Sequence, residues 1–145
     1  MRWVRRFASV FISFLLLSIN GRPAAAQHAA VNGTLRLQVD VPLSGAVVTA
    51  PFSVSGWTLD QAAASGSGVD AVHAWALVPG GSPIFVGAAT LGVARPDVAA
   101  AFGAQFARSG FTIATSAVLK PGTYTLAVLA KDAWGQEFLT SLDKE

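Results

Sequence analysis

A strict alternation of apolar and polar residues most limits the folds open to this chain. In residues 35–41, LRLQVDV, every second residue is apolar and the residues between them are polar. Successive side chains of a β-strand point to opposite faces, so this period of two predicts a strand with one buried face.

Six further runs of strand-forming residues follow, separated by turn signals such as Ser44-Gly45 and the PGGSP segment at 79–83. The runs cover residues 52–55, 69–78, 84–91, 111–115, 124–130 and 137–142. Seven short strands with turns between them in about a hundred residues are typical of an all-β sandwich. We therefore expect one seven-stranded sandwich domain over residues 34–145.

Residues 94–103, ARPDVAAAFG, interrupt this pattern between the fourth and fifth predicted strands. Pro96 suits the first turn of a helix, Asp97 suits its positive N-terminal end, and Gly103 can end it. Val98, Ala101 and Phe102 have the spacing of one apolar helix face. The segment therefore predicts a short helical crossover, placed to cover Trp57 or the edge of one sheet.

Arg95 and Asp97 flank Pro96 and carry opposite charges. A charge-assisted hydrogen bond between them would hold the crossover in place. The alternative is that the same two residues form part of a ligand-binding loop. We favour the structural role.

Tyr124 follows a Pro121-Gly122 turn and begins the sixth predicted strand. This position suits a tyrosine corner, in which the hydroxyl bonds to the backbone upstream; the alternative is an ordinary tyrosine at a strand start. Antibody domains carry a cysteine two residues after this tyrosine. Here that residue is Leu126, and the chain contains no cysteine, so packing must replace the disulfide.

The N-terminus reads as a targeting signal. Arg2, Arg5 and Arg6 precede an apolar stretch over residues 7–19, and alanines at 24–26 provide a small-residue cleavage site. This order predicts a signal peptide over residues 1–26, followed by a flexible segment over residues 27–33. An uncleaved membrane anchor is the alternative, but the stretch is short for a spanning helix. We expect a secreted or periplasmic protein with no membrane span after cleavage.

Cleavage would change the charge of the protein. Four of the ten basic residues lie in the signal, which leaves six against eight acidic residues and a net charge of about −2. No cluster of basic residues remains, so a nucleic-acid partner is not expected.

Three tryptophans remain as candidate ligand-binding residues: Trp57, Trp75 and Trp134. Exposed aromatic rings can stack on sugars or bind a protein partner, whereas buried ones only stabilise the core. In the second strand, Trp57 is out of phase with Phe52 and Val54. Either a bulge at Gly56 restores the phase, or Trp57 lies on the outer face beneath a covering segment.

Catalytic and metal-binding patterns are absent from the sequence. The only histidines are His28, in the predicted flexible segment, and His73, in the third predicted strand. No catalytic motif supplies a partner for His73 as a general base. Asp60, Asp70 and Asp132 offer oxygen ligands for Ca²⁺ but form no dense cluster. We expect no enzyme activity, no bound metal and no cofactor.

Five segments in order carry a family resemblance: PFSVSGWTLD (51–60), GVDAVHAWA (68–76), GVARPDVAAAFG (92–103), SGF (109–111) and LKPGTYTLAVLAKDAWG (119–135). Together they resemble bacterial immunoglobulin-like modules of exported and cell-surface proteins. The resemblance implies an immunoglobulin-like sandwich with no catalytic centre and no fixed ligand residues.

The function we expect is therefore that of an exported, non-catalytic module that binds an unknown protein or glycan of the cell envelope. One alternative is a carbohydrate-binding module that uses exposed tryptophans. A second is a structural accessory subunit of an envelope complex.

Overall fold

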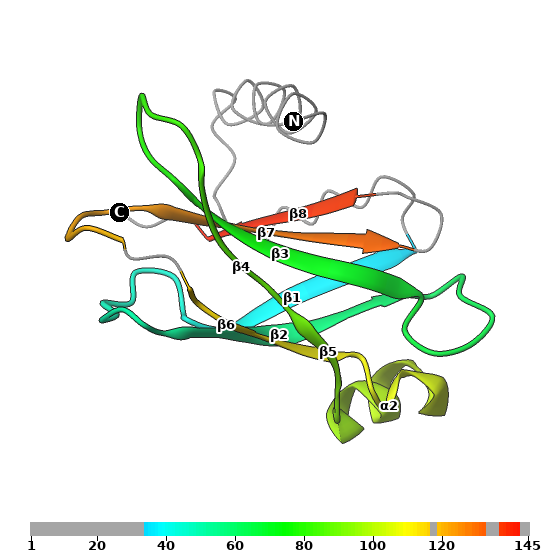
Figure 1. Cartoon of the computed structure of the whole chain (residues 1–145). Coiled ribbons are helices and arrows are strands. Elements are labelled where there is room, and N and C mark those ends of the chain that lie inside the picture. The colour runs from blue at the N-terminus through cyan, green and yellow to red at the C-terminus, as the bar shows by residue number, and fades with distance from the viewer. Residues whose placement is uncertain (1–33, 117–118, 133–136, 143–145) are drawn as a thin grey trace.

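A computed structural model describes residues 34–116, 119–132 and 137–142, which form two antiparallel sheets packed face to face (Figure 1). In sheet A the strand order is β1 (Leu35–Val41), β2 (Ser53–Asp60), β6 (Gly110–Ala114) and β5 (Thr90–Val93). In sheet B it is β4 (Ile84–Ala88), β3 (Val69–Leu77), β7 (Thr125–Asp132) and β8 (Glu137–Leu142). The predicted β-sandwich is confirmed.

The apolar side chains on the facing sides of the two sheets form the main core. Alternation along the strands supplies them, as in β1, where Leu35, Leu37 and Val39 are buried and Arg36 and Gln38 are exposed. The other fully or almost fully buried members are Val54, Val69, Val72, Ala74, Ala76, Val86, Phe111, Ile113, Leu126, Val128 and Ala130. Antiparallel sheets with one buried face require this pattern.

All seven predicted strands are present, but the fourth is divided into β4 and β5, which belong to different sheets. The chain crosses from sheet B to sheet A at Ala89, whose amide donates to the carbonyl of Val72 at 2.8 Å. At the crossing, a Cβ on Gly87 would lie 2.8 Å from Cγ2 of Ile113. Glycine therefore allows the backbone to pass this close to sheet A.

A bulge lies in β1 rather than at Gly56. The register with β2 shifts between Val39 and Val41, so Asp40 is the extra residue. Gly56 is paired on both sides, and a Cβ there would lie 1.9 Å from the Gln38 carbonyl oxygen. Of the two sequence interpretations, the structure has the one in which Trp57 lies on the outer face.

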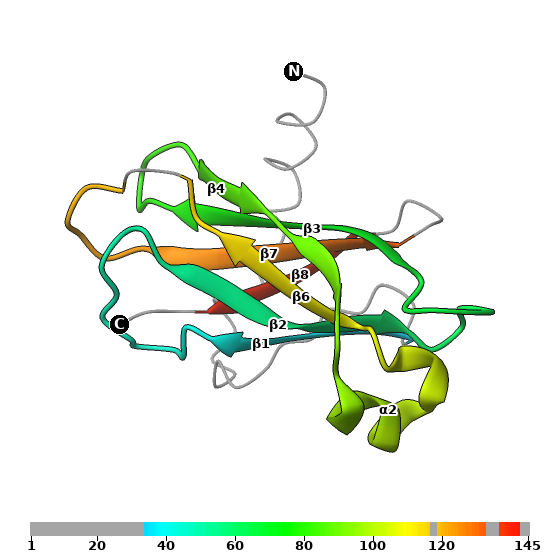
Figure 2. The ribbon, with the colours of Figure 1, turned by 60° about the horizontal axis from the view of Figure 1, so that its bottom comes forward.

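The predicted helical crossover lies between β5 and β6 (Figure 2). It consists of α2 (Pro96–Phe102) and the 3₁₀ turn η1 (Ala104–Phe106). Pro96 lies in the first turn, and Gly103 ends the helix with a φ of +124° that favours glycine.

The predicted signal peptide and the segment 27–33 lie outside the described residues. Within the part of the chain that the structure describes, no helix is long and apolar enough to cross a membrane.

Candidate functional site

The crossover covers the outer face of sheet A above Trp57. Leu59 of β2, Val98 of α2 and Phe106 of η1 are buried together in a second, smaller core. The ring of Trp57 packs against Phe102 with centroids 5.4 Å apart. Trp57 is thus a packing residue between the sheet and the helix.

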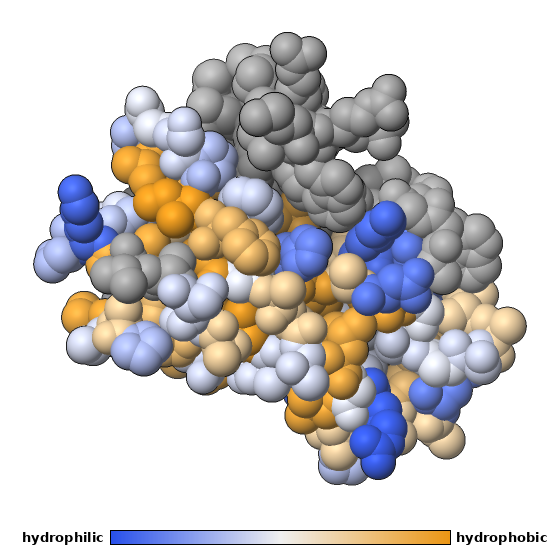
Figure 3. Space-filling model, viewed as in Figure 1, coloured by the Kyte–Doolittle hydropathy of each residue, from blue (hydrophilic) through white to orange (hydrophobic). Residues whose placement is uncertain are grey.

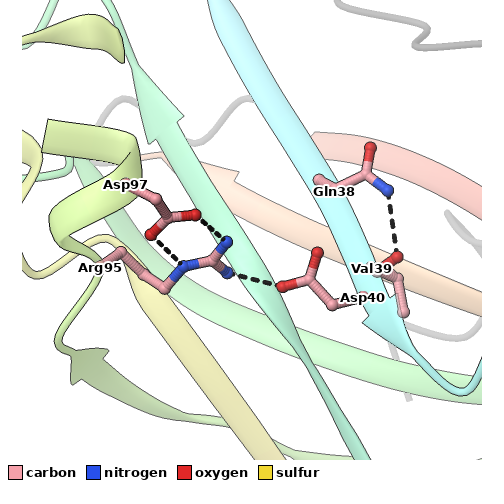
Figure 4. Close-up of polar contacts among 5 residues, drawn as sticks. All are labelled: Gln38, Val39, Asp40, Arg95 and Asp97. Carbon is pink, nitrogen blue, oxygen red and sulfur yellow. Dashed lines mark hydrogen bonds and ion pairs between the residues drawn. The ribbon is translucent and has the colours of Figure 1, made fainter. Parts of the chain in front are cut away.

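Arg95 lies immediately before α2 and contacts two carboxylates (Figure 4). Its Nε and Nη2 donate to the two carboxylate oxygens of Asp97, at 2.9 Å and 2.6 Å. Its Nη1 donates to Oδ2 of Asp40 in the β1 bulge, at 2.6 Å. We call these three residues the Arg95 cluster. The bidentate contact is the strong, oriented form of an arginine–carboxylate pair.

The backbone of sheet A makes room for the Arg95 side chain. A Cβ on Gly110 of β6 would lie 2.9 Å from Cγ of Arg95, so a larger residue would displace the arginine. The backbone amide of Arg95 donates to the carbonyl of Ala107 at 2.7 Å. The bulge at Asp40 completes the arrangement by directing a carboxylate to the guanidinium.

The electrostatics of the Arg95 cluster follow from these contacts. The hydrogen bonds from Arg95 lower the pKa of Asp97 to about 2, from an ordinary value of 3.8. The same hydrogen bond to Asp97 raises the pKa of Arg95. Arg95 and Asp97 are therefore both charged throughout the neutral range.

Trp75 lies on the outer face of sheet B. It packs with Leu77 against Ala127 and Leu129 of the neighbouring strand β7. Phe85 of β4 lies beside it, with ring centroids 5.0 Å apart in an edge-to-face arrangement.

His73 lies two residues before Trp75, on the same outer face of β3. Its ring meets Phe85 edge to face at 5.8 Å. Phe85 is 43% exposed, which makes it the accessible member of this aromatic group. We call His73, Trp75 and Phe85 the sheet B aromatic group.

The structure does not bring the candidate tryptophans together. Trp57 and Trp75 lie on opposite outer faces of the sandwich, so they cannot line one binding surface. Trp134 lies outside the described residues.

Tyr124 has the geometry expected of a tyrosine corner. Its hydroxyl donates to the backbone carbonyl of Lys120 at 2.8 Å. Gly122 lies against the ring, with its Cβ position 3.5 Å from Cε2 of Tyr124, and Pro121 before it is exposed. The hydrogen bond ties the loop after β6 to the start of β7.

The three candidate calcium ligands differ in their surroundings. Asp60 is buried, and its Oδ1 accepts a hydrogen bond from the amide of Ala62 at 2.9 Å, which closes a turn. Asp132 is also buried, and Asp70 is exposed. Among the described residues, no three His, Cys, Asp or Glu side chains are grouped as metal ligands.

Sequence reasoning did not identify two residues of these sites, Asp40 and Phe85. The alternation in β1 places Asp40 on the outer face, but only the bulge and the crossover bring it to Arg95. Phe85 follows a turn, and no local signal shows that it pairs with Trp75.

No family model, no curated protein and no solved structure matches this chain.

Proposed function

We propose that this chain is an exported, non-catalytic immunoglobulin-like module that binds a protein of the cell envelope through the outer face of sheet B. The N-terminal pattern of residues 1–26 is the basis for export. The observation that carries the binding function is the sheet B aromatic group, because the solvent side of an antiparallel sheet is normally polar. Aromatic residues are enriched in protein interfaces.

The strand order supports an immunoglobulin-like arrangement. Sheets of the order β1-β2-β6-β5 and β4-β3-β7-β8 correspond to the A-B-E-D and C′-C-F-G sheets of such domains. The Tyr124 hydrogen bond at the start of β7 matches the tyrosine corner of strand F. One departure is Trp75, which lies on the outer face of the strand where antibody domains bury a tryptophan, and there it packs against the exposed ring of Phe85.

The test is capture of envelope proteins by the purified chain and by Phe85→Ala. Phe85 is 43% exposed, so its removal should leave the fold intact while weakening the interaction. Val93→Ala is the matched control, because Val93 is 40% exposed and lies in the other sheet. We expect a specific protein to be captured by the unaltered chain and by the control, and to be lost with Phe85→Ala.

A parallel titration with polysaccharides, followed by tryptophan fluorescence, addresses the carbohydrate alternative. The edge-to-face packing of Phe85 on Trp75 offers no flat pair of rings to a sugar, which favours the protein partner. A spectral change with a glycan that disappears in Phe85→Ala, without protein capture, would replace the proposal by a carbohydrate-binding module. If the unaltered chain, Val93→Ala and Phe85→Ala captured the envelope protein equally, the outer face of sheet B would not be the binding surface.

A further inference from the structure

The loop between β1 and β2 (residues 42–52) exposes an unusual amount of aliphatic surface. Val41 at the end of β1 is 46% exposed, Leu43 70%, Val47 99% and Val48 37%. These are four of the seven large hydrophobic side chains that are exposed in the described part of the chain. We call these four residues the aliphatic tip.

A tight turn holds the aliphatic tip in shape. The amide of Ala46 donates to the carbonyl of Leu43 at 3.0 Å, and Gly45 takes a φ of +74° that the turn requires. Leu43 and Val47 therefore lie just before and just after a closed turn.

The aliphatic tip lies at one end of the sandwich and lacks charge. Residues 78–83, 115–116 and 119–124 lie at the same end as the loop 42–52 (Figure 1). Lys120 is the one charged residue in these segments of sequence. In Figure 3 this end of the molecule shows orange, apolar surface beside blue and pale, more hydrophilic surface. After β8, which also ends there, the sequence continues with Asp143, Lys144 and Glu145, outside the described residues.

We propose that the aliphatic tip contacts the hydrocarbon of a lipid surface. The loop 42–52 has no Trp, Tyr or Arg, the residues that dominate the binding energy of protein interfaces. Its one aromatic residue, Phe52, packs against the main core. Hydrocarbon needs no directional partner, and uncharged aliphatic side chains are complementary to it.

The backbone limits how deep this contact can be. Unpaired amides and carbonyls of an irregular loop cannot enter the bilayer core without a large cost. The side chains of Leu43 and Val47 therefore enter at the level of the interface while the loop backbone stays hydrated. Because the tip has no charge, its binding should not depend on ionic strength.

The test uses the absence of cysteine in the chain, which makes any introduced cysteine a unique labelling site. Val47→Cys and Val93→Cys are each labelled with an environment-sensitive fluorophore in the chain without residues 1–26, because the apolar stretch over residues 7–19 would itself bind the vesicles. Val93 is the matched control because it is 40% exposed and lies in β5, away from the loop. The probes are phosphatidylcholine vesicles and vesicles that also contain phosphatidylglycerol.

We expect the label at position 47 to brighten severalfold and shift to the blue with both vesicle types, at low and at high salt. The label at position 93 should not respond. Adding Leu43→Ser to the Val47→Cys protein should weaken the apparent affinity about tenfold, because one buried leucine side chain is lost.

Three results would overturn the proposal. They are no response at position 47, an equal response at position 93, and a response that persists unchanged in the Leu43→Ser protein. A vesicle-independent response that rises with protein concentration would assign the tip to contact between copies instead. Failure here leaves the protein-binding proposal intact, because that proposal depends on Phe85 in sheet B and its test contains no lipid vesicles.

Discussion

A single guanidinium group connects three parts of the chain on the outer face of sheet A. Arg95 precedes the crossover, Asp97 lies in its first turn, and Asp40 lies in the β1 bulge, 55 residues away. The contact between Arg95 and Asp97 is local, and the sequence predicts it from charge and spacing. The contact with Asp40 depends on the fold.

The Arg95 cluster predicts a dependence of stability on acid. Because the pKa of Asp97 is lowered to about 2, its charge stabilises the folded protein above its ordinary pKa of 3.8, and this contribution is lost as the pH falls from 3.8 toward 2. Asp97→Asn should therefore have a lower Tm than the unaltered chain at pH 5 to 7. The difference should shrink below about pH 4 and vanish only below pH 2, where Asp97 is protonated in both the folded and the unfolded protein. Thermal unfolding followed by circular dichroism across this range measures it; a difference that does not change with pH would contradict the prediction.

Two buried hydroxyls should respond in opposite ways to substitution. Ser109 is 2% exposed, and its Oγ has no hydrogen-bond partner among the described residues. Thr58 is 1% exposed, and its Oγ1 donates to the Arg36 carbonyl at 3.0 Å. Ser109→Ala should be neutral or raise the free energy of unfolding by up to about 1 kcal/mol, whereas Thr58→Val should lower it by about 1 kcal/mol. Urea unfolding measures both, and an equal loss in the two variants would contradict the assignment.

At the scale of elements, the crossover converts an outer sheet face into a second core. Pro96 and Gly103 give its limits, and Val98 and Phe106 supply its buried side chains. The helix has only seven residues, so its stability must come from this packing and from the Arg95 cluster.

Arg95→Ala should loosen the crossover from β1. We expect a loss of about 1 kcal/mol in the free energy of unfolding, which lowers the Tm by about 4 °C in a domain of this size. Arg95→Lys should recover part of the loss, because it keeps the charge without the bidentate fork. If Arg95 instead belonged to a ligand site, Arg95→Ala would abolish capture of the envelope protein and leave the Tm unchanged.

The sequence predicts these elements well where the signal is local. Neighbouring residues are enough to predict three features: the alternation in β1, the limits of α2 at Pro96 and Gly103, and the turn before Tyr124. The division of the fourth predicted strand does not, because β4 and β5 are separated by Ala89 alone. Only the close approach of Gly87 to Ile113 marks the change of sheet, and that is a long-range contact.

At the scale of the molecule, the two outer faces of the sandwich differ. The helix covers part of one face, and the other presents the sheet B aromatic group. The sequence predicts that tryptophans lie on strands, but it cannot show which partner covers each ring. Trp57 and Trp75 are both half-buried on outer strand faces, Trp57 against Phe102 of the crossover and Trp75 against Phe85 of β4.

Phe102 and Phe85 lie on opposite outer faces of the sandwich, so the effects of substituting them on stability should be additive. Phe102→Ala should lower the free energy of unfolding by about 1 to 2 kcal/mol, because it uncovers Trp57. Phe85→Ala should lower it by less, because Phe85 is 43% exposed. The double variant should equal their sum within about 0.5 kcal/mol. Phe102→Ala should also leave capture of the envelope protein unchanged. Coupling well beyond that margin would show that the two faces communicate through the core.

The passage of the chain between the sheets at Ala89 also bears on aggregation. It leaves β4 and β5 as the edge strands on that side, with five and four residues, and the register shifts beside both of them. Short, irregular edges are poor templates for a strand of another molecule. Strand addition from another molecule is therefore disfavoured at this side of the domain.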